Sequence, residues 1–144
     1  MTEKAAGSLS IRVCRLEDIE GVLELWRQAD ATPGVTDTAD DLWRAVAESL
    51  AQVLVAEVGG HVIGSIIGTF DGWRGNIYRL AVHPDQRRQG VACALVAEFE
   101  RRLTRQGTKR ITALVEKEHP WAMNFWEAVG YRVDERIVRR VRNL

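Results

Sequence analysis

The segment HPDQRRQGVA, residues 83–92, combines residue types that suit the binding of an anion. Arg87 and Arg88 precede Gly90, and apolar residues at helical spacing follow from Val91. The first turn of a helix carries unpaired N–H groups and the positive end of the helix dipole, so it can hold a phosphate. Glycine in that turn costs about 1 kcal/mol relative to alanine, which is explained if a ligand must approach the backbone closely. The alternative is an ordinary helix start with a solvated arginine pair.

Two common phosphate loops are absent from the sequence. It contains neither G-x-x-x-x-G-K-[ST] nor G-x-G-x-x-G, so neither a nucleoside triphosphatase nor a dinucleotide-binding protein is predicted. No Cys/His pattern has the spacing of metal ligands, and no metal is expected. The junction therefore predicts a polyphosphate site of another kind.

The composition is that of one ordinary globular domain spanning residues 1–144. Lys plus Arg number 20 and Asp plus Glu number 20, so no net charge attracts nucleic acid or an anionic membrane. The N-terminal residues hold no apolar run typical of a signal peptide, and no stretch reaches membrane-spanning length. Cys14 and Cys93 lack motif spacing and are expected to be buried thiols in a reducing compartment. We therefore expect a cytoplasmic protein.

Hydrophobic periodicity predicts alternating strands and helices. Strands are predicted at residues 10–16, 52–58, 61–70, 76–82, 109–116 and 131–142, the last being one closing strand or a bent pair. Helices are predicted at residues 17–30, 38–49, 89–105 and 121–129, with Thr38 as the N-cap of the second. Gly59 and Gly60 mark a hairpin, and DGWRG marks a second turn in which Asp71 is structural.

The fourth and fifth predicted strands lie on either side of the third helix, so they form a right-handed βαβ crossover and are parallel. The remaining strand pairs are predicted to be antiparallel. The predicted fold class is therefore α/β, with a mixed, mainly antiparallel central sheet and helices on both faces.

The junction resembles the acyl-CoA signature of the GNAT N-acetyltransferase superfamily, whose core is [RQ]-x-x-G-x-[GA]. Here that core is Arg87-x-x-Gly90-x-Ala92. The segment HPWAMNFWEAVGY is similar to a second family element, N-x-x-A-x-x-[FL]-Y-x-x-x-G-[FY]. The predicted order of elements is also that of the family, so the resemblance covers nearly the whole chain. The turn DGWRG and the leading IRVCRLED are most similar to the small bacterial YpeA-like branch.

This resemblance implies acetyl-CoA as the acyl-donor cosubstrate. Backbone amides at the junction would bind its pyrophosphate, and the fourth strand would part from the fifth so that the pantetheine arm pairs with the exposed backbone. Residues of the second motif would shape the thiol pocket. The cofactor-binding residues implied are Leu80, Ala81, Val82, Arg87, Arg88, Gln89, Gly90, Val91, Ala92, Phe125 and Trp126.

Two positions depart from the family pattern. Trp126 stands where many members have a tyrosine that protonates the departing thiolate, and indole has no acidic proton to give. His119 stands where the family frequently has an asparagine that contacts pantetheine. Attack by a neutral amine still requires a group that takes up its proton. The candidates for this catalytic role are Tyr78, Glu118 and His119, with a water relay as the alternative.

Trp26 and Trp43 lie on the first two predicted helices, which in the family form one wall of the acceptor site. Core packing is the alternative explanation for both. If they line the site, an acceptor cation could stack on an aromatic ring. The acids that could attract such a cation, Asp37, Asp40 and Asp41, are also explained by the helix dipole.

The resemblance implies an N-acetyltransferase that moves an acetyl group to a primary amine by direct attack in a ternary complex. The acceptor would be a small molecule, a protein N-terminus or a lysine, and the chain a monomer or homodimer. Neither nucleic acid nor a membrane is expected as a partner. The alternative, motivated by Trp126, is a non-catalytic acyl-CoA-binding or sensing module.

Overall fold

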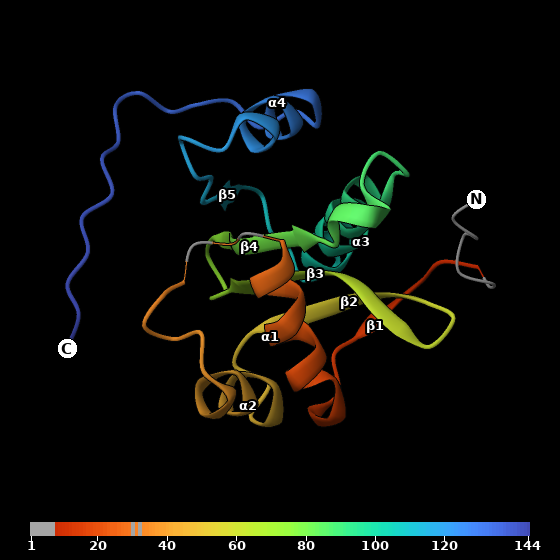
Figure 1. Ribbon diagram of the computed structural model, residues 1–144. Helices are drawn as coiled ribbons and strands as arrows, with labels where there is room; N and C mark the ends of the chain where they lie inside the picture. The colour runs from red at the N-terminus through yellow and green to blue at the C-terminus, as the bar shows by residue number, and fades with distance from the viewer. Residues whose placement is uncertain (1–7, 30, 32) are drawn as a thin grey trace.

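The computed structural model describes residues 8–29, 31 and 33–144 of the chain (Figure 1). Its strands are β1 (Ser10–Val13), β2 (Gln52–Val58), β3 (His61–Phe70), β4 (Gly75–Val82) and β5 (Ile111–Ala113). Its α-helices are α1 (Ile19–Gln28), α2 (Ala39–Ala47), α3 (Val91–Arg105) and α4 (Pro120–Ala128), and the short 3₁₀ helices are η1 (Leu16–Asp18) and η2 (Pro84–Gln86). The strands form one sheet in the order β1-β2-β3-β4-β5.

The strand pairing confirms the predicted fold class. β1, β2, β3 and β4 pair antiparallel in succession, whereas β4 and β5 pair parallel on either side of α3. The β2–β3 hairpin turns at Gly59 and Gly60, whose φ angles of +57° and +80° lie in the left-handed region. A two-residue hairpin turn that matches the twist of its strands requires two successive left-handed residues. The glycine pair therefore forms the hairpin that the sequence predicts.

Helices cover both faces of the sheet, as predicted (Figure 1). Along β2, Val53 and Val55 pack with α1 and α2, while Leu54 and Ala56 pack with α3 and α4. This alternation follows from the two-residue period of a strand. Each face therefore has its own apolar core.

α3 lies close to the sheet where Phe99 packs on Gly68 of β3. Phe99 is fully buried, and a Cβ atom added at Gly68 would stand 2.4 Å from its ring. The same Cβ would stand 2.1 Å from the carbonyl oxygen of Asn76 on β4. Only glycine allows this approach, so Gly68 lets α3 pack directly on β3.

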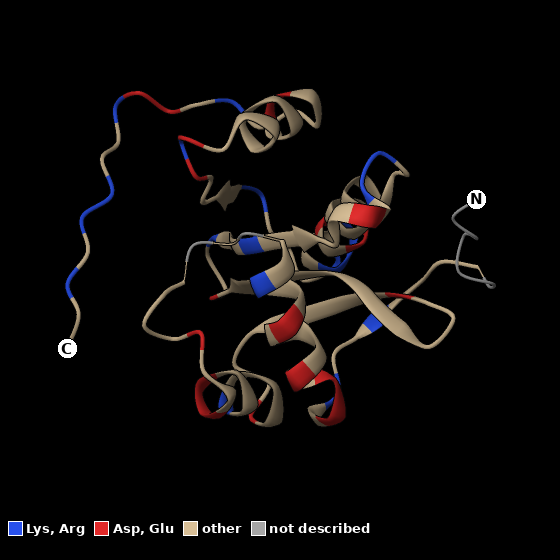
Figure 2. Ribbon diagram, viewed as in Figure 1, with Lys and Arg blue, Asp and Glu red and all other residues tan. Residues whose placement is uncertain are grey.

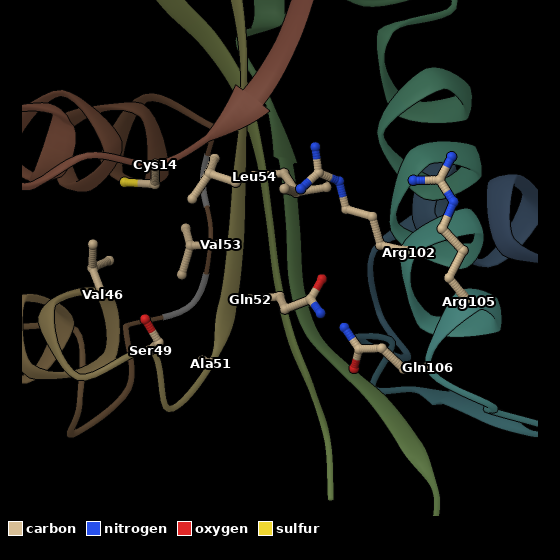
Figure 3. Close-up of a pocket in the computed structure, with 11 residues that line it drawn as sticks. Cys14, Val46, Ser49, Ala51, Gln52, Val53, Leu54, Arg102, Arg105 and Gln106 are labelled. Atoms are coloured by element: carbon tan, nitrogen blue, oxygen red, sulfur yellow. The ribbon is translucent and has the colours of Figure 1, made fainter. Parts of the chain in front are cut away.

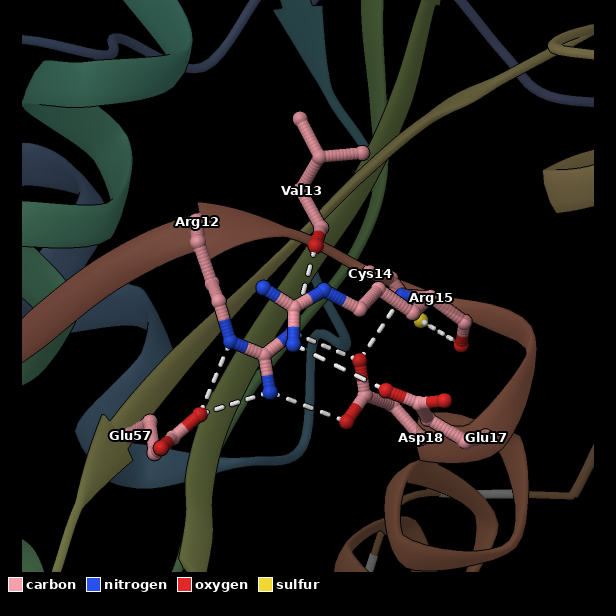
Figure 4. A network of polar contacts seen from close by, with 7 residues as sticks. All are labelled: Arg12, Val13, Cys14, Arg15, Glu17, Asp18 and Glu57. Carbon is pink, nitrogen blue, oxygen red and sulfur yellow. Dashed lines mark hydrogen bonds and ion pairs between the residues drawn. The ribbon is translucent and has the colours of Figure 1, made fainter. Parts of the chain in front are cut away.

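A polar network holds the short edge strand β1 (Figure 4). Arg12 donates to both carboxylate oxygens of Asp18, at 2.6 and 3.0 Å, and through Nε to Glu57 of β2 at 2.8 Å. Asp18 also accepts the N–H of Arg15 at 2.7 Å. These bonds favour the ionised carboxylate, so the pKa of Asp18 is lowered, chiefly by Arg12.

Several predicted boundaries are corrected by the structure. The first strand ends at Val13, because Arg15 and Asp18 turn the chain into η1 before α1. The second helix has Thr38 as its N-cap, as predicted, but ends at Ala47. The strand predicted at residues 109–116 is reduced to three residues in β5, because the chain leaves β4 after Ala113.

The predicted closing strand at residues 131–142 is wrong. This segment is described in full and forms no strand, and its apolar side chains Val133, Ile137, Val138 and Val141 are exposed. β5 offers an outer edge of only three residues, too short to pair with a strand of that length. Figure 2 shows Lys and Arg positions, in blue, spaced along this extended segment, which runs away from the sheet.

Candidate functional site

The site begins where β4 and β5 part. Their parallel pairing covers three residues of each strand and ends at Ile77 and Ala113. The N–H of Leu114 still reaches the carbonyl of Ile77 at 3.0 Å, and beyond this point β4 continues to Val82 paired with β3 but not with β5. This parting of β4 from β5 after Ile77 is the predicted splay.

A β-bulge on β4 lies at this same point. The register changes between the pairs Ile67–Arg79 and Gly68–Ile77, so Tyr78 has no partner on β3. Ile77 and Val82 belong to the same core although they are five positions apart, an odd offset that would place them on opposite faces of a regular strand. A bulge of one residue accounts for both observations.

The bulge determines which backbone groups face the gap. The N–H of His83 donates to Ile63 of β3 at 2.8 Å, so alternation directs the backbone of Ala81 to β3 as well. The backbone groups of Leu80 and Val82 therefore point to the open side. Of the three residues predicted to meet pantetheine, these two present free main-chain groups there.

Gly90 caps α3 rather than lying inside its first turn, which corrects the predicted start at residue 89. Its φ of +81° is left-handed, and Arg88 is also left-handed with φ of +64°. A side chain at Gly90 would meet nothing within 4 Å, so the residue is required for its conformation and leaves open space in front of the helix.

The backbone amides around this cap have no acceptor. Among the described residues, none accepts a hydrogen bond from the N–H groups of residues 88–93, and the first amide of this helix to be paired is that of Ala94, to Gly90 at 3.0 Å. The left-handed residues Arg88 and Gly90 turn the backbone so that successive N–H groups line a concave surface, which can bind an anion. Together with the helix dipole it makes the site suited to a phosphate group.

The side chains of the junction have separate roles. Arg88 and Gln89 are exposed beside the free amides, whereas Val91 is buried in the core and Ala92 is half-buried against it. Arg87 turns away, donating to the carbonyl of Ala29 at 3.3 Å. The predicted charge beside the anion site thus comes from Arg88 more directly than from Arg87.

α4 contributes a line of aromatic rings. Phe125 and Trp126 meet edge to face at 5.3 Å, and Trp126 meets Tyr131 at 4.9 Å. Trp126 is buried and belongs to the core on the α3 face. Tyr131 donates to Glu100 of α3 at 2.8 Å, and burial together with this bond raises its pKa. The indole of Trp126 therefore has a packing role.

Three side chains with buried, unpartnered polar atoms lie together at the start of α4. The Arg87 guanidinium lies 5.4 Å from the Trp121 ring, and the His119 ring meets Trp121 edge to face at 5.4 Å. Within the part of the chain that the structure describes, Arg87 Nε, His119 Nδ1 and Trp121 Nε1 are buried with no hydrogen-bond partner. Such groups are costly unless a ligand or water satisfies them.

The three candidate bases do not form one group. Tyr78 is exposed at the bulge, with its hydroxyl accepting from Thr69 at 3.4 Å. His119 contacts Trp121 near Arg87, at the other end of the gap from Tyr78. The strand between Tyr78 and Val82 alone spans roughly 13 Å. Glu118 is exposed in the turn before α4.

Of the two explanations given for Trp26 and Trp43, the structure supports core packing for Trp26. Trp26 is buried and donates to Ser65 at 2.9 Å. Asp37 is engaged by Arg79 of β4 at 2.7 Å, so its charge is neutralised and does not attract a cation. Trp43 is exposed on α2, as a wall residue would be.

Two smaller predictions have opposite outcomes. Asp71 accepts the N–H groups of Trp73 and Arg74, each at 2.8 Å, which confirms its structural role in the turn. Cys14 is buried, and burial raises its pKa to about 11, but Cys93 is exposed on the first turn of α3. The expectation of two buried thiols is therefore wrong for Cys93.

The family model for the acetyltransferase (GNAT) family matches residues 19–131. The chain belongs to that family. A curated relative, acetyltransferase SG1711 of Sodalis glossinidius (strain morsitans), is 35% identical over 130 residues, which are 90% of this chain and 92% of the relative. The match does not separate branches of the GNAT family, so the YpeA-like similarity stays a prediction.

Solved structures share the GNAT fold at lower identity. The PaiA N-acetyltransferase of Thermoplasma acidophilum in complex with coenzyme A has a TM-score of 0.79 at 18% identity, covering 89% of this chain and 92% of that one. The aminoglycoside N-acetyltransferase AAC(6')-Iy in complex with CoA has a TM-score of 0.75 at 18% identity, covering all of both chains. A ribosomal-protein-alanine N-acetyltransferase of Brucella melitensis biovar Abortus 2308 has a TM-score of 0.74 at 17% identity, covering 95% and 100%.

The bulge and the polar cluster were not predicted from the sequence. Gly68 was a usable signal for the bulge, because a glycine inside a strand marks a bulge or a close approach. The cluster of Arg87, His119 and Trp121 joins residues far apart in the chain and has no local signal. No three potential metal ligands gather within the described ranges, nor does any helix there have the length and hydropathy to cross a membrane.

Proposed function

We propose that this protein is an acetyl-CoA-dependent N-acetyltransferase acting on a primary amine. The observation that carries the proposal is the run of unpaired amides at residues 88–93, which opens beside the unpaired edge of β4. One ligand with a pyrophosphate and a long polar arm would satisfy both. Coenzyme A has both parts, and membership of the GNAT family supports it as the donor.

The pyrophosphate would accept hydrogen bonds from the backbone of residues 88–92, with Arg88 and Gln89 beside it. The pantetheine arm would run along the gap and pair with the main-chain groups of Leu80 and Val82. Its amides would supply partners for Arg87 Nε, His119 Nδ1 and Trp121 Nε1, which are buried and unsatisfied.

The acetyl group would then lie near the bulge, at the closed end of the gap. A neutral amine attacks the thioester carbonyl carbon, the C–S bond breaks and the CoA thiolate leaves. The amine proton passes to a base, for which Tyr78, Glu118 and His119 are the candidates, or to water. Water protonates the thiolate, because Trp126 is buried and has no acidic proton. Placement of the two reactants supplies most of the rate.

A small-molecule amine is the acceptor class that we favour. Structural neighbours include aminoglycoside N-acetyltransferases, one of them solved in complex with sisomicin. A neighbour named as a ribosomal-protein-alanine N-acetyltransferase keeps a protein N-terminus among the acceptors to be tested.

Cys93 gives a direct test of donor binding. It is exposed on the first turn of α3 and the other cysteine is buried, so iodoacetamide should modify Cys93 selectively. Acetyl-CoA, which unlike CoA has no free thiol to consume iodoacetamide, should slow this modification by roughly a hundredfold at a hundredfold excess over its Kd, because the share of free protein falls by that factor. S-acetylpantetheine, which lacks the pyrophosphate, should protect far less. Gly90→Glu, which adds a side chain and a negative charge at the cap, should abolish protection, and unchanged protection in this variant would contradict the site.

Turnover separates the enzyme from a binding module. Acetyl-CoA would be incubated with an aminoglycoside, a diamine, an alanine N-terminal peptide and a lysine peptide, and CoA release and acetylated amine would be measured. Formation of an acetylated amine supports the proposal. Protection of Cys93 by acetyl-CoA without turnover on any primary amine would instead support a non-catalytic acyl-CoA-binding module.

A further inference from the structure

The C-terminal end of α3 borders a cavity of about 440 Å³ (Figure 3). The start of β2 forms one side of this cavity, and Arg102 and Arg105 of α3 form the other together with Gln106, which follows the helix. The anion site at residues 88–93 lies at the opposite end of α3, roughly 20 Å away along a helix of 15 residues. The proposed acetyl transfer makes no use of this cavity.

Gln52 lies on the side of β2 that faces α3, whereas Ser49 lies on the other side (Figure 3). In Figure 3 the side chain of Gln52 extends from β2 toward Arg102 of α3 and toward Gln106, the residue that follows α3. Its Oε1 atom is buried and has no hydrogen-bond partner among the described residues. An amide oxygen buried without a hydrogen bond is destabilising, and a ligand with an N–H or O–H group would supply the missing partner.

Two guanidinium groups face the same space. Arg102 uses its Nε on Glu98 at 3.2 Å, and Glu98 is shared with Arg101. Arg105 is exposed and makes no ion pair with any described residue. Arginine in the last turn of a helix is favoured by the dipole, but that explanation accounts for neither the cavity nor the buried oxygen of Gln52.

The rest of the wall is mainly apolar, with Ser49 as its polar side chain. Val13 and Leu54 line the cavity beside Gln52. A ligand that fits must therefore carry a negative charge for the arginines, a donor for Gln52 and an apolar body for this wall.

We propose that this cavity is a second binding site, for a small organic carboxylate with a hydroxyl or N–H group next to the carboxylate. The carboxylate accepts hydrogen bonds from Arg102 and Arg105, which is the geometry that guanidinium groups suit. The neighbouring group donates to Gln52 Oε1, and the apolar body lies on Val13 and Leu54.

Three probes of matched shape test the three parts of the site. Mandelate has a carboxylate, a neighbouring hydroxyl and an aromatic ring; phenylacetate lacks the hydroxyl; benzyl alcohol lacks the carboxylate. Calorimetry should show that mandelate binds, that phenylacetate binds roughly three- to tenfold more weakly, as for the loss of one hydrogen bond, and that benzyl alcohol does not bind. Equal affinity for mandelate and phenylacetate, or no binding of mandelate, would overturn the proposal.

Excess CoA distinguishes the two ends of α3. Mandelate affinity should be the same with and without CoA, because the cavity is distant from the anion site. If CoA displaces mandelate, the carboxylate binds at residues 88–93 and the second site is refuted. This comparison remains informative if the protein fails to turn over acetyl-CoA.

Two variants and a matched control locate the binding. Arg105→Gln should weaken mandelate by roughly tenfold or more, whereas Arg139→Gln on the exposed C-terminal segment should not. Gln52→Leu should remove the preference for mandelate over phenylacetate. Thermal unfolding checks that each variant folds. If Gln52→Leu does not fold, the preference of the natural protein for mandelate over phenylacetate is the test of the contact with Gln52. Unchanged affinity in Arg105→Gln would overturn the proposal.

Discussion

At the scale of single residues, the donor site is made mainly of backbone. Gly90 contributes its left-handed conformation and open space, and residues 88–93 contribute their N–H groups. Side chains matter most at the other end of the gap, where Tyr78 is exposed at the bulge. Binding and proton transfer are therefore expected to respond to different substitutions.

Trp126→Phe separates packing from acid catalysis. Trp126 is 6% exposed and packs between Phe125 and Tyr131, so the variant should lose about 1–2 kcal/mol of stability through the space it leaves. Because the indole donates no proton to the thiolate, kcat should remain within a factor of roughly a hundred, the usual cost of losing an acid–base group. Steady-state kinetics below the melting temperature checks this. A larger loss of kcat in folded protein would show that Trp126 acts in the reaction.

The proton acceptor is identified by three single variants, Tyr78→Phe, Glu118→Gln and His119→Ala. The rate should rise with pH as the neutral amine accumulates. The variant that removes the base should lower kcat/KM by roughly a hundredfold or more and change the shape of that profile. A residue that only positions the donor should change KM for acetyl-CoA instead, which is what we expect of His119 from its contact with Trp121. Three unchanged profiles would leave water as the acceptor.

At the scale of elements, the edge strand β1 depends on its ion network more than on its length. β1 has four residues, and Arg12 joins it to both η1 and β2. Arg12→Met should therefore cost about 1–2 kcal/mol of unfolding free energy, as for the loss of a few partly exposed hydrogen bonds.

The network also predicts how stability depends on pH. The folded-state pKa of Asp18 lies below its usual value of 3.8, so the stabilisation is complete above that value and is lost as the pH falls through the lower folded pKa. The stability difference between the natural protein and Asp18→Asn should shrink as the pH is lowered below about 4. Urea unfolding at several pH values measures it, with Glu17→Gln, whose side chain is exposed, as the control. A difference that stays constant with pH would contradict the role of Asp18.

Elements with local signals could be predicted from the sequence. Thr38 caps α2 and the glycine pair turns the β2–β3 hairpin, because both effects act within a few residues. The closing strand could not be judged in this way. Its apolar residues suit a strand, but a strand exists only where another edge accepts it, and β5 is too short.

At the scale of the whole molecule, the candidate site joins parts that the sequence shows separately. The motif around Gly90 was sufficient to predict the anion site, since amides and dipole belong to the helix start itself. The neutralisation of Asp37 by Arg79 and the burial of Trp26 depend on contacts between distant elements. The distribution of charge, in contrast, agrees with the composition. Figure 2 shows positive and negative residues mixed over the helices, and the chain has equal numbers of the two.

The bulge at Tyr78 makes one residue of β4 dispensable for the register of the strand. Tyr78 has no partner on β3, so its removal would make Gly68–Ile77 and Ile67–Arg79 successive pairs and restore regular alternation. Val82, which is 2% exposed, would stay in the core that it shares with Ile77, and the main-chain groups of Leu80 and Val82 would still face the gap. The loss of the Tyr78 codon in a natural variant should therefore leave folding and donor binding largely intact, so that a loss of turnover in such a variant would report on the Tyr78 side chain itself.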